Sequence, residues 1–251
     1  MTLRCYERRP GARLRLFCFP HAGGSASSFR TWPELLPADI ETHAVQYPGR
    51  ENRMRDPLVH RMDDLIAEIV DAVIALDDLP FAFFGHSMGA AVAYETAVAL
   101  RDRGARRPVH LFASAREAPH LARGGDVHLR DEDGICAEIG RLGGTAGEVL
   151  KQRELRDLIV PVVRNDYRLI ETYLPTIGPP LDHPVTVLRG DVDPEVTEDE
   201  ALGWKTVAGD RFEVVVFAGD HFFLVPAREN VVELVRRELR AHNETESGEI
   251  T

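Results

Sequence analysis

The chain has 251 residues, of which 44% are hydrophobic and 28% are charged, and its formal net charge is −11. This composition is typical of a globular protein with one large or two small domains, and the acidic balance disfavours nucleic acid as a partner. No apolar run reaches the length of a membrane span, no signal peptide is recognisable, and three sparse cysteines suit a reducing cytoplasm, so we expect a cytoplasmic protein without a membrane partner.

Strand and helix signals alternate along the first 114 residues. Four strands are predicted in this part, at 13–19, 40–47, 81–85 and 109–114. Helices are predicted between them, at 27–35, 62–76 and 88–103. Such alternation predicts an α/β fold in which a mostly parallel central sheet is flanked by helices on both faces.

The alternation stops between residues 119 and 179, where no strand is predicted. Helices are predicted there at 131–142, 146–151 and 154–173, with a kink or a helix boundary at Pro161. Strands return at 185–189 and 212–217, before a last helix at 228–241 and a polar, frayed tail.

We interpret residues 119–179 as a helical lid inserted into a core formed by 1–118 and 180–251. Ligands bind at the carboxyl ends of the strands in such sheets, so the lid is expected over that edge. A peripheral helical decoration far from the site is the alternative.

A serine sits in the pentapeptide Gly85-His86-Ser87-Met88-Gly89, directly after the apolar run Phe81-Ala82-Phe83-Phe84. A buried strand followed by Gly-x-Ser-x-Gly and a helix is the nucleophile elbow of serine hydrolases. The sharp turn requires glycine on both sides of the serine, because a Cβ there would collide with the neighbouring strand or helix. Ser87 is therefore the predicted nucleophile.

His221 is the predicted general base, because it follows a predicted strand late in the chain, as the chain order Ser, Asp, His requires. His183 precedes a strand instead, and His242 lies in the tail. The third member comes from Gly190-Asp191-Val192-Asp193-Pro194. We favour Asp193, while Asp191 is expected to cap backbone amides. Asp220, next to the base, is expected to stabilise its own loop.

Two backbone amides are predicted to stabilise a tetrahedral oxyanion. One belongs to Met88, the residue after the nucleophile. The other is assigned to Ala22, in the turn Pro20-His21-Ala22-Gly23-Gly24-Ser25. This turn has neither the Lys of a P-loop nor a dinucleotide fingerprint.

Five motifs together resemble the type II thioesterases, which are the stand-alone editing enzymes of polyketide and nonribosomal peptide assembly lines. They are Phe19-Pro20-His21-Ala22-Gly23-Gly24, Tyr47-Pro48-Gly49-Arg50-Glu51, Gly85-His86-Ser87-Met88-Gly89, Arg189-Gly190-Asp191-Val192-Asp193-Pro194 and Gly219-Asp220-His221-Phe222-Phe223. The resemblance implies an α/β-hydrolase fold with a helical lid, a Ser87–His221–Asp193 triad, and an oxyanion hole formed by Ala22 and Met88.

The same resemblance implies hydrolysis of acyl groups from the phosphopantetheine arm of acyl or peptidyl carrier proteins. It implies no metal and no cofactor beyond the phosphopantetheine that the substrate carries. We expect apolar lid residues to line the acyl channel. A small-molecule carboxylesterase and a non-catalytic module that binds carrier proteins are the alternatives.

Two groups of arginines are interpreted as solvated surface residues, although either could form a docking patch for an acidic partner. They are Arg50, Arg53, Arg55 and Arg61, and Arg101, Arg103, Arg106 and Arg107.

Overall fold

The computed structural model describes residues 1–142, 152–209 and 211–248. Within these ranges a seven-stranded sheet has the strand order β1-β3-β2-β4-β5-β6-β7. All neighbouring strands run parallel except β1, which pairs antiparallel with β3. The strands are β1 (Leu3–Cys5), β2 (Leu14–Phe19), β3 (Ile40–Val45), β4 (Phe81–His86), β5 (Leu111–Ser114), β6 (Val185–Gly190) and β7 (Phe212–Phe217). The predicted mostly parallel sheet is thus confirmed.

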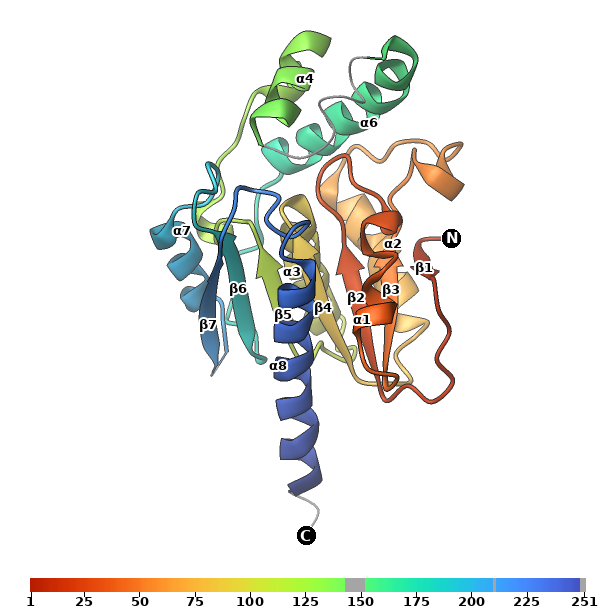
Figure 1. Cartoon of the computed structure of the whole chain (residues 1–251), viewed down its shortest axis with the longest axis vertical. Coiled ribbons are helices and arrows are strands. Elements are labelled where there is room, and N and C mark those ends of the chain that lie inside the picture. The colour runs from red at the N-terminus through yellow and green to blue at the C-terminus, as the bar shows by residue number, and fades with distance from the viewer. Residues whose placement is uncertain (143–151, 210, 249–251) are drawn as a thin grey trace.

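Alternate side chains of the central strand β4 build two separate cores. Phe81 and Phe83 pack with α2 (Met62–Ile74) and α3 (Met88–Asp102) on one face. Ala82 and Phe84 point to the other face, where they pack with α1 (Trp32–Leu35) and α8 (Arg228–Gly248). Successive side chains of a strand alternate between faces, so one fully buried strand supplies both layers. Figure 1 shows α8 on one side of the sheet and α2 and α3 behind it.

The six predicted strands are confirmed with boundaries shifted by at most two residues, but β1 was missed. Three residues at a sheet edge are too short to display a strand periodicity. The predicted helix 27–35 is divided into a 3₁₀ helix, η1 (Ala26–Phe29), and α1. Pro33 lacks the N–H that would continue the first helix into the second. The tail does not fray where predicted, because α8 continues to Gly248.

The inserted segment places two long helices above the carboxyl edge of the sheet, α4 (Glu132–Arg141) and α6 (Arg153–Thr172) (Figure 1). Pro161 lies inside α6, so of the two predicted alternatives the helix boundary is absent, while the kink stays a prediction. The predicted helix 146–151 lies outside the described residues. The limits of the lid at 119 and 179 stay a prediction.

Short helices complete the described chain, and none of its helices is long and apolar enough to cross a membrane. They are η2 (Glu51–Arg53), η3 (Pro119–Leu121), η4 (Val127–Leu129), α7 (Glu198–Leu202) and η5 (Gly203–Thr206).

Candidate active site

Ser87 occupies the sharp turn between β4 and α3. Its backbone has φ 55° and ψ −120°, a conformation that L residues rarely adopt. A Cβ at Gly85 would overlap the backbone of Gly89 in α3, and a Cβ at Gly89 would overlap the backbone oxygen of Phe19 in β2. Both glycines are therefore sterically required, as the motif predicts, and the turn exposes the serine side chain at the end of the strand.

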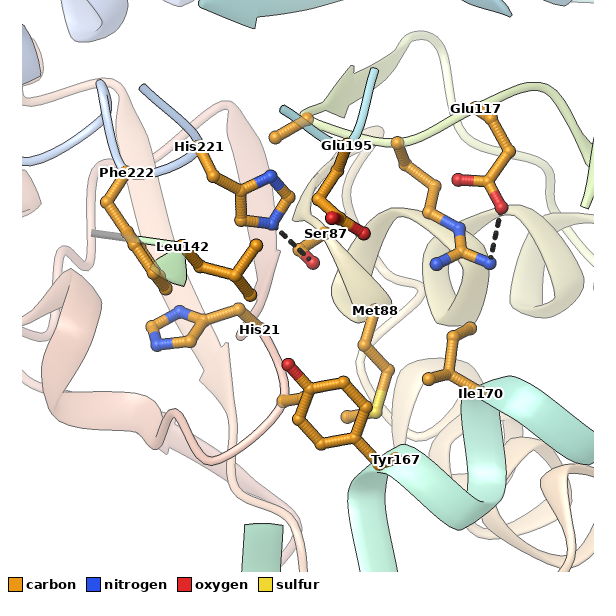
Figure 2. Close-up of a pocket in the computed structure, with 13 residues that line it drawn as sticks. His21, Ser87, Met88, Glu117, Leu142, Tyr167, Ile170, Glu195, His221 and Phe222 are labelled. Atoms are coloured by element: carbon orange, nitrogen blue, oxygen red, sulfur yellow. Dashed lines mark hydrogen bonds and ion pairs between the residues drawn. The ribbon is translucent and has the colours of Figure 1, made fainter. Parts of the chain in front are cut away.

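The structure brings Ser87, His221 and Asp193 together from three loops at the carboxyl edge. Ser87 Oγ lies 2.9 Å from His221 Nε2, the contact drawn in Figure 2. His221 Nδ1 lies 3.1 Å from each carboxylate oxygen of Asp193. The carboxylate accepts the Nδ1–H, which leaves Nε2 free to accept the serine proton. The Asp193 side chain is fully buried, and it also accepts the Glu195 N–H at 2.9 Å.

The two neighbouring aspartates, Asp191 and Asp220, accept hydrogen bonds from backbone N–H groups rather than from the imidazole of His221. Asp191 accepts the Gly219 N–H at 2.8 Å and so ties the β6 loop to the β7 loop. Asp220 accepts the Phe222 N–H at 2.8 Å within its own loop. Each matches the structural role that the sequence suggested for it. Between Asp191 and Asp193, the latter is the one hydrogen-bonded to His221.

Two further histidines pack around His221 and remain neutral near pH 7. Burial, with His221 and Arg50 nearby, lowers the pKa of His21 to about 4. Burial also lowers the pKa of His86 well below its usual range, and its Nδ1 lies 2.9 Å from Ser114 Oγ. Neither ring is hydrogen-bonded to Ser87, so His221 is the imidazole placed to accept the serine proton.

His183 lies at the opposite end of β6 from Asp193 and so outside the site. It is 5% exposed, and neither ring nitrogen has a hydrogen-bond partner among the described residues. Burial and then Arg107 lower its pKa to about 4, although the Asp182 carboxylate lies 3.4 Å from Nδ1. Burial therefore penalises the charged form of this ring more than Asp182 compensates.

Because His183 is buried in its neutral form, we predict that the folded protein loses stability in mild acid. The unfolded chain binds a proton near pH 6.5 and the folded chain only near pH 4, so stability falls as the pH drops between these values. The full shift corresponds to about 3 kcal/mol. Urea unfolding at several pH values should show this loss, and His183→Gln should make the dependence shallower. An unchanged dependence in the variant would contradict the prediction.

The predicted oxyanion donors, Ala22 and Met88, line a cavity with Ser87 and His221. Among the described residues neither backbone N–H has a hydrogen-bond acceptor. An unpaired amide beside a nucleophile is available to an oxyanion. Met88 is the first residue of α3, so the helix dipole also favours negative charge there.

The cavity at Ser87 has a volume of about 60 Å³, and the α6 residues Tyr167 and Ile170 also line it (Figure 2). A second cavity of about 360 Å³ shares these two residues. The shared wall is partly charged, because it also contains the Arg116–Glu117 ion pair, at 2.9 Å, and Glu195. Leu142 and Ile170 of the inserted segment line the cavity at Ser87, as expected of apolar lid residues, and the charged groups beside them come from outside that segment.

Sequence reasoning also misassigned part of the first arginine group. Arg50 and Arg53 are each only 8% exposed. Arg50 is paired with Asp166 of α6 and Arg53 with Glu68 of α2. The second group includes surface ion pairs, with the Arg103 side chain 44% exposed. These pairs could not be foreseen, because each partner carboxylate lies on another element.

One cluster among the described residues could hold a metal ion by distance alone. Ligand atoms of Cys5, Glu41 and His43 lie within 4.8 Å of one another. The Glu41 carboxylate is already engaged, since it accepts the Arg9 N–H at 2.7 Å and lies 3.5 Å from Arg15 Nε. These contacts compete with a cation, and the cluster lies on β1 and β3 at the sheet edge. We assign no metal to it.

The fold and the Ser87–His221–Asp193 arrangement define a serine hydrolase of the α/β-hydrolase class. Residues 14–239 match the thioesterase domain family, and the chain belongs to this family. A probable cadicidin biosynthesis thioesterase of Streptomyces griseus is 43% identical over 222 residues, which are 88% of this chain and 61% of that protein. This chain thus spans less than two thirds of that relative.

Other relatives are matched over more of their length. The thioesterase PikA5 of Streptomyces venezuelae is 40% identical over 225 residues, which are 89% of this chain and 80% of that protein. The solved structure of the type II thioesterase BorB, from the borrelidin biosynthetic cluster, matches with a TM-score of 0.87 at 37% identity. That match covers 95% of this chain and 97% of BorB. The type II thioesterase resemblance is confirmed.

Proposed function

We propose that this protein hydrolyses acyl groups from the phosphopantetheine arm of acyl or peptidyl carrier proteins, and so removes stalled or aberrant units in polyketide or nonribosomal peptide biosynthesis. The observation that carries the chemistry is the Ser87–His221 contact of 2.9 Å, backed by the buried Asp193. The biosynthetic relatives support the choice of thioester over other acyl substrates.

In the proposed mechanism, His221 takes the proton from Ser87 as the serine oxygen attacks the thioester carbonyl. The N–H groups of Ala22 and Met88 stabilise the oxyanion of the tetrahedral intermediate. His221 then protonates the leaving thiol, and the acyl group remains on Ser87. The same imidazole activates a water molecule that releases the acid and restores the serine.

The small cavity at Ser87 favours short acyl units. Its volume of about 60 Å³ lies below the roughly 300–1,000 Å³ of common ligand sites. The pantetheine arm needs a passage past α6, so we expect the lid to move during turnover. The charged wall shared with the larger cavity would penalise a long alkyl chain, because ion pairs would lose hydration without compensation.

The proposed steps use side chains and backbone amides of this chain, so we expect no metal or cofactor to be required. We place the protein in the cytoplasm, where its three free thiols would stay reduced.

The test is intact-mass monitoring of holo carrier protein loaded with acyl groups of increasing length. Matching acyl-CoA thioesters and an oxygen ester are run beside it. Deacylation of the carrier protein, fastest for short acyl groups, is the expected result. Cleavage of the oxygen ester alone would replace the proposal with a carboxylesterase. Binding of the carrier protein without cleavage of any substrate would indicate a non-catalytic module.

A further inference from the structure

The turn that carries Ala22 is held by the lid helix α6. Asp166, which is 1% exposed, accepts the Gly23 N–H at 2.7 Å. Val163 lies one turn earlier on α6, and its Cγ2 is 2.7 Å from the position that a Cβ on Gly23 would occupy. Gly23 also has φ +77°, which favours glycine. The helix therefore contacts the turn both by packing and by hydrogen bonding.

Arg50 links the same carboxylate to the other side of the turn. Its guanidinium donates to both oxygens of Asp166, at 2.6 and 2.8 Å, and to the carbonyl oxygen of Gly24 at 3.0 Å. Its Nε donates to the Pro48 carbonyl at 3.2 Å, which fixes the arginine to its own loop. A bidentate pair restricts orientation as well as distance. The turn is thus held at successive residues by one buried network.

These contacts set the direction of the Ala22 N–H. The Gly24 N–H donates to the His21 carbonyl at 2.9 Å, and in a trans peptide the Ala22 N–H points opposite to that carbonyl. Asp166 fixes the next peptide through Gly23, and Arg50 fixes Gly24. The Ala22 amide has no freedom to turn unless one of these bonds breaks.

We propose that Arg50 and Asp166 are positioning residues for the Ala22 N–H, so that the oxyanion hole is complete only while α6 is seated on the turn. The inference rests on the proposed function, because it assigns Ala22 to the oxyanion. A lid that lifts removes Asp166 from Gly23 and releases the donor. A lid that closes on substrate restores it, which couples catalysis to closure.

The test replaces both charges together, in Arg50→Met/Asp166→Leu. Removing one partner leaves a buried unpaired charge, whereas the apolar pair avoids that charge and removes only the bonds to the backbone of the turn and of the Arg50 loop. Removing a whole oxyanion donor costs about 10²–10³ in kcat, so a misaligned donor should cost about 10–100-fold. The substrate is an acyl N-acetylcysteamine thioester, for which KM should change less than about threefold.

A second readout separates positioning from a general structural role. An alkylboronic acid forms a tetrahedral adduct with a catalytic serine, and one of its oxygens occupies the oxyanion position. In the double variant, the Kd of this boronic acid should rise by the same factor as kcat falls. The Kd of a non-reactive thioether analogue of the substrate should stay unchanged, because it places no oxyanion in the hole.

Two controls match the double variant. Arg53→Met/Glu68→Leu removes a neighbouring ion pair whose bonds measure 2.5 and 3.2 Å and whose side chains are not hydrogen-bonded to the turn at 20–25. Tyr173→Phe removes the 3.1 Å bond to Glu95 that ties the end of the lid to α3, without touching the turn. Both should retain kcat and boronate affinity within about twofold, since neither orients Ala22.

The proposal is overturned if Arg50→Met/Asp166→Leu melts like wild type and keeps kcat and boronate affinity. It is also overturned if kcat of the double variant falls while its boronate affinity stays. Equal losses of kcat and boronate affinity in Tyr173→Phe would overturn it as well. Should the double variant not fold, Arg50→Lys carries the same test, because lysine keeps the charge beside Asp166 but loses the bidentate pair and the bond to the Gly24 carbonyl, and parallel losses of kcat and boronate affinity are expected. A wild-type protein that cleaves no thioester defeats the proposed function itself.

Discussion

The Ser87→Ala variant is expected to lose about 10⁶-fold in kcat towards the proposed acyl carrier protein substrate, because the triad acts as a unit and no other group takes over the attack. The remaining rate would come from the backbone amides of Ala22 and Met88, which still stabilise a water-derived oxyanion. Ser87 Oγ contacts His221 Nε2 at 2.9 Å, so its removal deletes the nucleophile aligned with the base. Single-turnover deacylation followed by intact mass measures the loss.

Folding and binding must remain for this loss to report on chemistry. Alanine adds no atom to the turn, and the backbone at φ 55° is already accommodated by its neighbours. We therefore expect an unchanged melting temperature within a few degrees and unchanged affinity for the acylated carrier protein that we propose as substrate. Ser28→Ala, at an exposed serine of η1, is the matched control and should keep full activity. Retention of activity within tenfold by Ser87→Ala would assign the nucleophile elsewhere.

The turn at Ser87 and the base His221 could be predicted because a few neighbouring residues determine their local geometry. Gly85 and Gly89 are needed for steric reasons within five residues, and a strand precedes them. His221 follows a strand end, where parallel strands place their loops at one edge. Asp193 needed a choice between two aspartates in one loop, since the direction of each side chain depends on backbone angles that sequence does not reveal.

The contacts of the lid could not be predicted for a different reason. Arg50 looks like one of several surface arginines until Asp166, 116 positions later, is placed over it. The same holds for Tyr167, which reaches the cavity only because α6 lies across the carboxyl edge. A helix of known sequence can dock in several orientations, and packing against the turn at Gly23 selects one. Contacts between residues far apart in the sequence depend on how α6 packs on the core, and the local sequence pattern does not reveal this.

The Asp193→Asn variant is expected to lower kcat by about 10⁴-fold, as in triads where the same change reverses the imidazole tautomer. Asparagine keeps an oxygen for the Glu195 N–H but presents an amide to His221 Nδ1. Nε2 then carries the proton, and the ring can no longer accept the proton of Ser87. The measurement is steady-state kinetics on an acyl thioester, with the loss expected in kcat rather than KM.

The matched control for this variant is Asp191→Asn, two positions earlier in the same loop. Its amide oxygen can still accept the Gly219 N–H, which the carboxylate accepts at 2.8 Å, so activity should stay within about twofold. Both variants should melt within a few degrees of wild type, because each keeps its backbone hydrogen bond. A nearly normal rate for Asp193→Asn with collapse for Asp191→Asn would transfer the orienting role to Asp191. Collapse of both would mean that the β6–β7 loop pairing, rather than one carboxylate, holds His221 against Ser87.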